Sequence, residues 1–410
     1  MKKIGGEKMI YRGSYLKELL YWRDKQVIKV ITGIRRCGKS TMFSLFIDEL
    51  LKDGVEKEQI IRINLEDMAY EELLEYHKLY SYVKERLQSG KKTYIFLDEI
   101  QNCQEFERAV DSLFIQPDTD IYITGSNAFM LSGELATLLS GRYVTISMQP
   151  LSFAEFYSVC ENMVKEQAFQ EYMKYGGFPY ITRLNGNEEA VRQYLEGIYN
   201  TILVKDVANR EKISDLTILE SIVRTLASNI GSPISTKKIA DTLISNGRKI
   251  SINTVDRYVR ALVDSYIFYK VDRYDVKGRQ YLKTFGKYYI ADTGLRRLLT
   301  AESTSDMGHL LENIVYMELK RRYMRVGIGK IAEFETDFVV ENADESAYYQ
   351  VSASVLDEGT KERELRPLQK IKDNHPKVLL TLDVIGKNAN YDGIRQYNLI
   401  DWLLEEKIEH

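Results

Sequence analysis

The stretch Val27–Leu50, VIKVITGIRRCGKSTMFSLFIDEL, decides the fold of this 410-residue chain. Its first six residues form a β-branched run that predicts a short buried strand, and Thr41–Leu50 repeats apolar side chains at helical spacing. Between them, Gly33–Ser40 matches the pattern GxxxxGK[ST] at every fixed position. Strand, glycine loop and helix in this order are the context that a phosphate-binding loop requires.

The residue types of this loop suit the binding of a nucleotide. Gly33 and Gly38 let backbone N–H groups turn toward an anion, and the helix N-terminus adds the positive end of its dipole. We expect Lys39 to reach the β- and γ-phosphates of ATP, and Ser40 to ligate Mg²⁺. Cys37 stands at a variable position, where a neutral role and a steric sensitivity to alkylation are both open. The residues expected to line the nucleotide here are Gly33, Ile34, Arg35, Arg36, Cys37, Gly38, Lys39, Ser40 and Thr41.

A phosphate loop of this kind needs an acidic strand end beside it. The segment KTYIFLDE supplies a hydrophobic strand, Tyr94–Leu97, that ends in Asp98 and Glu99. We expect Asp98 to hold the magnesium shell. Glu99 is expected to orient the attacking water, because positioning dominates phosphoryl transfer when the transition state is loose.

Another strand, Asp120–Gly125, is followed by Ser126 and Asn127. In ATPases whose glutamate strand lies beside the loop strand, a polar residue here contacts the γ-phosphate or the water; an ordinary Asn-containing turn is the alternative. Gln59–Leu65 and Tyr143–Met148 complete a predicted five-stranded parallel sheet. Helices on both of its faces would make this an α/β domain.

Five segments of the chain resemble the AAA-type ATP-binding proteins of bacteria and archaea. They are GIRRCGKST (33–41), IFLDE (95–99), ITGSN (123–127), LSGRYVTISMQPLSFAEF (139–156) and YGGFP (175–179). The resemblance extends over almost the whole chain. It implies a P-loop AAA core joined to a winged helix and a C-terminal domain of unassigned function.

The same resemblance implies further nucleotide contacts. Arg142 stands where related ATPases place an arginine on the γ-phosphate, in cis or from a neighbouring subunit, and a surface arginine is the alternative. An arginine acting in trans would require a homo-oligomer, which the sequence leaves open. Pro179, in Gly176–Pro179, resembles an element that closes over adenine, and an ordinary Gly-Pro turn is the alternative. Tyr11–Arg12 resembles a segment that packs near the base in relatives.

The remaining pattern divides the chain further. We expect the ATPase core over residues 1–160, the lid over 161–212, the winged helix over 213–290 and a C-terminal α/β domain over 291–410. The winged helix is predicted from two helices, Ser235–Leu243 and Ser251–Val263, and a hairpin of Ile267–Arg273 with Gln280–Phe285. Ser251 or Asn253 would cap the second helix.

Whether the winged helix binds double-stranded DNA stays open. Between Arg248 and Lys287, ten Lys and Arg stand against four Asp. Basic residues suited to DNA phosphates are Arg257, Arg260, Lys277, Arg279 and Lys283. Packing between domains is the alternative, because the formal net charge of the whole chain is −3.

The C-terminal pattern looks like a restriction-endonuclease-type core. Its expected elements are helices at Asp306–Arg322 and Glu362–Asp373 and strands at Ala332–Val340, Ala347–Ser352 and Lys377–Asp383. The counterparts of the nuclease residues are Glu312, Asp337 and Gln350, but Ser352 replaces the lysine that cleavage needs. We favour a degenerate nuclease fold used for binding or assembly over an active nuclease or an unrelated α/β domain.

Composition excludes several classes of protein. An apolar fraction of 44% and a charged fraction of 29% are typical of globular domains. We find no apolar run of about 20 residues, no secretory signal and no clustering of the three cysteines. A membrane span, a disulfide framework and a zinc site are therefore not expected, and the cytoplasm is the expected compartment.

The combined prediction is an enzyme that hydrolyses Mg²⁺-ATP to ADP and phosphate and couples this to movement of its winged-helix and C-terminal domains. Its protein partner is unknown from the sequence. The alternative is a nucleotide-gated switch for DNA binding or assembly with negligible turnover. An ATP-dependent nuclease is the least favoured reading.

Overall fold

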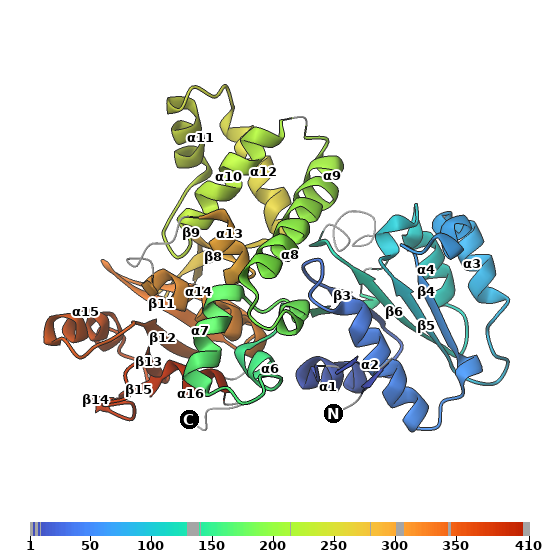
Figure 1. Ribbon diagram of the computed structural model, residues 1–410, viewed down its shortest axis with the longest axis horizontal. Coiled ribbons are helices and arrows are strands. Elements are labelled where there is room, and N and C mark those ends of the chain that lie inside the picture. Colours follow the sequence, from blue (N-terminus) through green and yellow to red (C-terminus); the bar gives the residue numbers. More distant parts are fainter. Residues whose placement is uncertain are drawn as a thin grey trace. The chain divides into compact units, whose positions relative to one another are not determined.

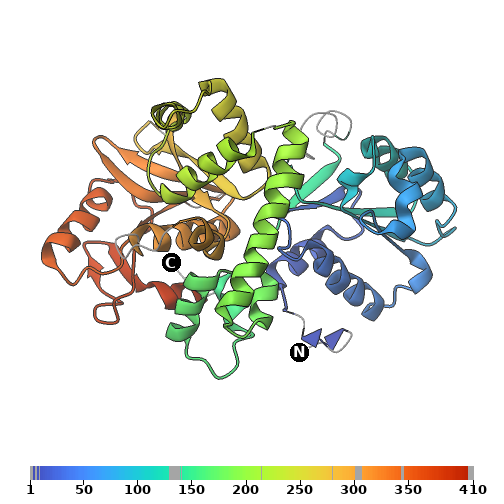
Figure 2. The same ribbon diagram turned by 45° about the horizontal axis from the view of Figure 1, so that its top comes forward.

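The computed structural model describes residues 3–4, 7–8, 10–128, 139, 141–213, 215–278, 280–300, 307–342 and 346–404, with the side chains of 3, 4, 7, 8 and 283–285 left out. The chain forms two compact units (Figures 1 and 2). The first consists of Met1–Pro150 with Asp264–Tyr266, and the second of Leu151–Val263 and Ile267–His410.

The first unit is built on a five-stranded sheet in the order β4-β5-β6-β3-β7, and every neighbouring pair is parallel. This confirms the sheet predicted from the sequence. The strands are β3 (Ile28–Thr32), β4 (Ile60–Asn64), β5 (Thr93–Asp98), β6 (Thr119–Gly125) and β7 (Tyr143–Ser147). The central strands are almost entirely buried, as expected for a parallel sheet covered on both faces.

Side chains that alternate along β5 bind the two helical layers to the sheet. Ile95 and Leu97 belong to a core cluster with residues of α3 and α4, whereas Phe96 packs against Phe43 and Phe46 of α2. Successive strand residues point to opposite faces, so one hydrophobic run serves both layers. The elements around the sheet are β1 (Lys3–Ile4), β2 (Glu7–Lys8), α1 (Gly13–Trp22), α2 (Lys39–Lys52), α3 (Tyr76–Lys84), α4 (Phe106–Phe114), η1 (Lys57–Gln59), η2 (Met68–Leu74) and η3 (Ile100–Asn102).

One premise of the sequence argument was wrong: the acidic strand β5 does not lie beside the loop strand β3. Strand β6 is inserted between them and pairs with both, Leu97 with Ile123 on one side and Thr32 with Gly125 on the other. The carboxyl end of β6 therefore lies between the acidic strand end and the phosphate loop.

The second unit contains an eight-stranded sheet in the order β14-β15-β13-β12-β11-β10-β8-β9. Its strands are β8 (Phe268–Asp275), β9 (Gln280–Ile290), β10 (Arg325–Ile331), β11 (Phe334–Glu341), β12 (Ser346–Val351), β13 (Lys377–Thr381), β14 (Asn390–Tyr391) and β15 (Ile394–Asn398). The predicted hairpin, β8–β9, is part of this sheet, because Arg273 of β8 pairs in parallel with Ile328 of β10. The two strands of the hairpin therefore form one end of the eight-stranded sheet.

Helices surround this sheet, and none of those described is both long and apolar enough to cross a membrane. They are α6 (Phe153–Tyr157), α7 (Lys165–Tyr175), η5 (Pro179–Arg183), α8 (Glu188–Thr201), the π-helical η6 (Ile202–Ala208), α9 (Asn209–Glu211), α10 (Leu216–Ser228), α11 (Thr236–Ser245), α12 (Ile252–Asp264), α13 (Thr293–Leu299), α14 (Met307–Arg322), α15 (Glu358–Gln369) and α16 (Leu399–Leu404). Ser251, one of the two candidate caps of α12, accepts a hydrogen bond from Thr254 N.

Helix α15 lies four residues earlier than the sequence pattern predicted, spanning Glu358–Gln369 and not Glu362–Asp373. The reason lies at its start, where the Asp357 side chain accepts from Thr360 N and caps the helix. Strands β10, β14 and β15 were not predicted at all.

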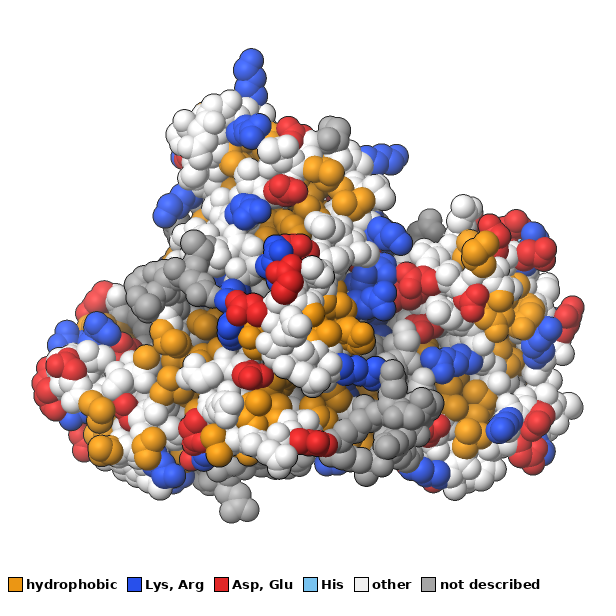
Figure 3. Space-filling model, in the orientation of Figure 1, with side chains coloured by type: hydrophobic (Ala, Val, Ile, Leu, Met, Phe, Trp, Pro, Cys, Tyr) orange, Lys and Arg blue, Asp and Glu red, His pale blue; other side chains and the backbone are white. Residues whose placement is uncertain are grey.

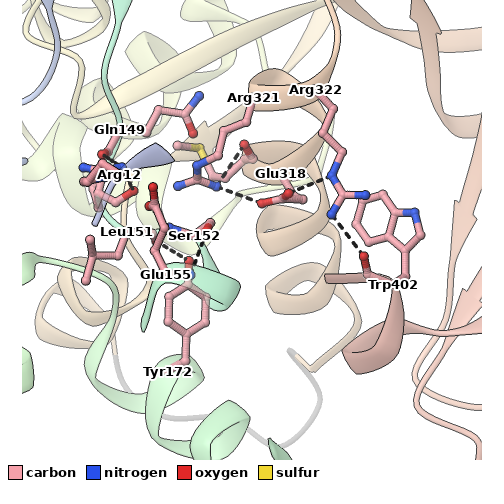
Figure 4. Close-up of polar contacts among 12 residues, drawn as sticks. Arg12, Gln149, Leu151, Ser152, Glu155, Tyr172, Glu318, Arg321, Arg322 and Trp402 are labelled. Carbon is pink, nitrogen blue, oxygen red and sulfur yellow. Dashed lines mark hydrogen bonds and ion pairs between the residues drawn. The ribbon is translucent and has the colours of Figure 1, made fainter. Parts of the chain in front are cut away.

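A cationic side chain ties helix α14 to the C-terminal helix α16. Arg322 pairs with Glu318 at 2.7 Å, donates to the carbonyl oxygen of Trp402 at 3.0 Å and lies over the indole ring (Figure 4). Arg321 pairs with the other oxygen of Glu318. These partly buried contacts fix the end of the chain's last described helix within the second unit.

Candidate functional site

The loop between β3 and α2 adopts a backbone that its glycines allow. Gly33 and Gly38 have φ of +148° and +106°, and Arg36 also has a positive φ of +67°. A Cβ atom at Gly33 would stand 2.0 Å from the carbonyl oxygen of Met148, so no other residue fits there. Gly38 then serves as the N-cap of α2.

Lys39, the first residue of α2, directs its side chain back into this loop. Its ammonium is buried and donates to the carbonyl oxygens of Gly33 at 3.0 Å and Ile34 at 3.4 Å. Glu99 Oε1 lies 3.8 Å from the same nitrogen. A buried cation held by two carbonyls and one carboxylate is a fit partner for phosphate oxygens, which would satisfy it better.

The acidic strand end is fixed by a residue of the neighbouring strand that the sequence argument missed. The hydroxyl of Thr124, at the end of β6, donates to Asp98 Oδ1 and accepts from the backbone N–H of Glu99. All three residues are buried. The signal was a hydroxyl side chain just before Gly125 in the ITGSN segment.

Glu99 itself has a left-handed backbone, with φ of 51° and ψ of 48°. This conformation is uncommon for a residue with a side chain and is typical of sites where a side chain must be aimed. The turn directs its carboxylate to Lys39 on one side and Gln101 on the other. Gln101 was also not singled out from the sequence.

Ser126 and Asn127 follow β6 and are almost fully buried. Because β6 lies between β5 and β3, these residues occupy the edge of the sheet that carries Asp98 and the phosphate loop. A contact of Asn127 with the γ-phosphate or the water stays a prediction.

Arg142 lies at the other edge of the sheet. Its carbonyl oxygen accepts from the backbone N–H of Ile28, the first residue of β3, whereas the phosphate loop follows Thr32 at the strand's far end. Five strand residues at about 3.3 Å each put about 16 Å between the two ends. The guanidinium pairs with Asp111 and lies over Phe114. The structure therefore does not bring Arg142 to its own chain's phosphate loop.

The other residues of the loop differ in their exposure to solvent. Cys37 is fully buried with its sulfur 3.7 Å from the carbonyl oxygen of Met148, and burial raises the pKa of its thiol. Arg36, Ser40 and Thr41 are exposed. Arg35 forms an ion pair of 2.8 Å with Glu66.

Arg12 contacts the backbone of the phosphate loop. Its buried guanidinium donates to the carbonyl oxygen of Cys37 at 2.9 Å and to that of Gln149 at 3.0 Å. Figure 4 shows Arg12 beside Gln149. The side chain also lies over the ring of Tyr15. The Tyr11–Arg12 segment thus contacts the loop backbone, and its proximity to a base stays a prediction.

Pro179 lies in the second unit, at the first position of η5. The preceding glycines are fixed by Asp292, whose carboxylate accepts from Gly177 N at 2.7 Å and Leu295 N at 3.1 Å. Burial raises the pKa of Asp292 to about 6. The expected contact of Pro179 with adenine stays a prediction.

The expected nuclease counterparts also come together within the second unit. Glu312 Oε1 accepts from Lys287 Nζ at 3.0 Å and from the hydroxyl of Tyr289 at 2.5 Å, and Lys287 also pairs with Glu335. Burial and the charge of Glu312 raise the pKa of Asp337 well above its usual range. Lys287, a β9 residue with no assigned role in this cluster, thus supplies its positive charge.

The other residues of the second unit that the sequence analysis named are Ser352 and the basic residues expected at DNA. Ser352 donates to the carbonyl oxygen of Ser354. Among the described residues, no group of three or more His, Cys, Asp or Glu is arranged to hold a metal ion. Of the basic residues expected at DNA, Arg279 and the Lys283 side chain lie outside the described part of the chain.

The donor set of the first unit nevertheless suits Mg²⁺ bound together with ATP. Mg²⁺ takes only one or two protein oxygens when phosphates and waters complete its octahedron. The exposed hydroxyl of Ser40 and the carboxylate of Asp98 supply oxygens of the right kind. The residues present therefore fit the nucleotide and its metal.

The strand order, the loop and the acidic strand end together define a P-loop core of the AAA type. Residues 25–157 match the family described as AAA domain, and residues 166–306 match a domain of unknown function. An uncharacterized protein of Haemophilus influenzae is 39% identical over 405 residues, which cover 97% of this chain and 99% of that protein.

The uncharacterized protein MJ1544 of Methanocaldococcus jannaschii is 31% identical over 370 residues, or 84% of this chain and 79% of that protein. The chain therefore belongs to one family with these two proteins, a family of AAA-type P-loop proteins. The Walker-type ATPase PABY2304 of Pyrococcus abyssi has a similar fold, with a TM-score of 0.51, 14% identity and coverage of 71% of this chain and 96% of that structure.

Proposed function

We propose that the chain binds Mg²⁺-ATP and hydrolyses it to ADP and phosphate. The observation that carries this proposal is the placement of Lys39 and Glu99 in one buried site, with 3.8 Å between the ammonium and the carboxylate. A phosphate-binding cation and a water-orienting carboxylate are the two groups that must flank a γ-phosphate. Lys39 is the first residue of α2, and Glu99 directly follows the last residue of β5.

Each group then has a defined task. Backbone N–H groups of the loop and the Lys39 ammonium bind the phosphates, and Ser40 with Asp98 would hold the metal. Mg²⁺, when bound, neutralises charge on the phosphate oxygens. Glu99 orients a water whose oxygen attacks the γ-phosphorus while the bond to the β–γ bridging oxygen breaks. ADP leaves, and the water's proton passes to the released phosphate.

Binding of ATP changes the partners of Lys39. The ammonium now donates to carbonyl oxygens of its own loop, and phosphate oxygens would replace these acceptors. Glu99 would lose its cationic neighbour at the moment when the γ-phosphate arrives. The ionic partners of Lys39 and Glu99 thus change when ATP binds. Such a change is needed if nucleotide binding is to alter the conformation of other parts of the protein.

Nucleotide state is proposed to act on the lid (161–212), the winged helix (213–290) and the C-terminal domain (291–410). Lys287 pairs with Glu312, and Ser352 stands where cleavage needs a lysine. These features favour binding or assembly over DNA cleavage for the C-terminal domain. A protein partner, a homo-oligomer in which Arg142 serves a neighbour, and the cytoplasm as compartment belong to the same proposal.

A second candidate is a nucleotide-gated switch that binds double-stranded DNA. Several Lys and Arg side chains are exposed over α11 and α12, among uncharged side chains at the top of Figure 3. The exposed basic residues there are Lys237, Lys238, Arg248, Lys249, Arg257 and Arg260. Arg260 is paired with Asp256, so it is less suited to phosphates than its neighbours.

Steady-state phosphate release across a protein dilution series, with and without double-stranded DNA, separates these functions. The ATPase proposal expects Mg²⁺-dependent turnover. A rise in turnover per subunit with concentration would support an assembling machine, and a rise with DNA would support the α11–α12 surface. ATP binding without turnover would contradict the proposed hydrolysis and would favour the nucleotide-gated switch.

A further inference from the structure

The two carboxylate oxygens of Glu99 have different partners. Oε1 faces the ammonium of Lys39 at 3.8 Å, and Oε2 accepts a hydrogen bond of 2.5 Å from Nε2 of Gln101. Lys39 belongs to the phosphate loop, so Oε1 is the oxygen on the nucleotide side. Gln101 holds the other oxygen.

The amide of Gln101 has one sensible orientation. An NH₂ group must face the carboxylate, because a carbonyl oxygen there would meet an acceptor without a proton between them. The Gln101 carbonyl oxygen, Oε1, is then directed away from Glu99. It is buried, and no donor within the described part of the chain reaches it. A buried acceptor left without a donor is unfavourable and needs a reason.

The turn that carries Gln101 is held at three points. The backbone N–H of Glu99 donates to Thr124, the N–H of Asn102 donates to the carbonyl oxygen of Glu99, and the Asn102 amide donates to the carbonyl oxygen of Leu65. Gln101 therefore lies on the short helix η3 with little freedom to leave Glu99. Such rigidity is what a group that aims another group needs.

We infer that Gln101 is the positioning residue of the water that attacks ATP. This inference rests on the proposed ATPase function and deepens it. When ATP draws Lys39 to its phosphates, Gln101 Nε2 keeps Glu99 Oε2 tied, so Oε1 stays turned to the nucleotide. A water that donates a proton to Oε1 then keeps a lone pair for the γ-phosphorus.

The test compares Gln101→Met, which keeps the length of the side chain and removes the amide, with Gln101→Glu, which replaces the donor by a repelling carboxylate. Gln104→Met is the matched control, because Gln104 is exposed and follows on the same segment. We expect kcat for ATP hydrolysis to fall about tenfold or more in both Gln101 variants. The Kd for a fluorescent ATP analogue and the Tm should stay near wild type, as should all three values in the control.

A double-mutant cycle with Glu99→Gln shows whether Gln101 acts through Glu99. We expect Gln101→Met to lower single-turnover phosphate release strongly in the wild-type background and hardly at all in the Glu99→Gln background. Equal losses in both backgrounds, an unchanged kcat, or a loss that follows Kd or Tm would overturn the inference. If Glu99→Gln alone has no effect, the failure lies with the proposed function, because Glu99 itself is then not used.

Discussion

The ammonium of Lys39 lies 3.8 Å from the Oε1 atom of Glu99, and both side chains are buried. One belongs to the phosphate loop and the other to the acidic strand end, which are separated by strand β6 in the sheet. Without nucleotide, each is the other's counter-charge. Under the proposed ATPase function, ATP binding and water activation would be linked through this ion pair, since Lys39 would turn to the phosphates before Glu99 is released.

Removal of the ammonium should abolish nucleotide binding. In Lys39→Ala, the γ- and β-phosphates lose their only buried cation in this loop, and Glu99 is left without its partner. We expect the affinity for Mg²⁺-ATP to fall by at least about 100-fold, which corresponds to about 2.7 kcal/mol. Isothermal titration calorimetry measures this. Lys52→Ala, an exposed lysine at the other end of α2, is the control and should bind as the wild type does.

Alkylation of Cys37 should be slow. The thiol is fully buried, faces the carbonyl oxygen of Met148 and has a pKa raised by burial, so little thiolate is available. We expect iodoacetamide to modify the partly exposed Cys160 first, as mass spectrometry of peptides would show. Rapid labelling of Cys37 that ATP prevents would contradict this arrangement of the loop.

Arg142 should matter only in an assembly. Its guanidinium is bound to Asp111 at the edge of the sheet opposite to the phosphate loop, so it does not serve its own chain. We expect Arg142→Ala to leave ATP affinity unchanged and to remove any rise of turnover per subunit with protein concentration. Turnover that falls equally at all concentrations, without assembly of the wild type, would be the opposite result. Arg108→Ala is a control on the exposed surface of α4.

Asp292 should make stability decrease between about pH 4 and pH 6. Burial raises the pKa of this carboxyl to about 6 in the folded chain, above its ordinary value of 3.8, so the folded state holds its proton longer than the unfolded one. Its contribution is present at pH 4 and is lost as the pH rises through 6, by at most about 3 kcal/mol. Chemical unfolding of the wild type and Asp292→Asn at several pH values measures the difference. Parallel curves for the two proteins would refute the assignment.

The sequence was informative where a pattern is local. The run from Val27 to Leu50 predicted a strand, a loop and a helix, and the hydrophobic run before Asp98 predicted the acidic strand end. Both predictions succeeded because each feature depends on residues that are adjacent in the sequence. The five parallel strands followed from the same short hydrophobic runs. Their order did not, since parallel strands are joined by crossovers and neighbours in the chain need not pair.

Contacts between distant segments were beyond the sequence. Thr124 joins the site because β6 pairs with β5, and the resemblance that placed Tyr11–Arg12 near the base did not predict the hydrogen bond of Arg12 to the loop backbone. Arg142 matches a family position, yet only the strand register shows that it stands at the opposite edge. Lys287 pairs with Glu312 because β9 and α14 pack together in the second unit, and local periodicity does not encode such a contact between two separate elements.

The measurement that tests the central claim most directly is phosphate release by Glu99→Gln beside its affinity for Mg²⁺-ATP. The substitution keeps the size of the side chain and removes the charge that faces Lys39. We expect the affinity to stay within about threefold of the wild type and turnover to fall by at least about 100-fold. A Glu99→Gln protein that still hydrolyses ATP at the wild-type rate would contradict the account.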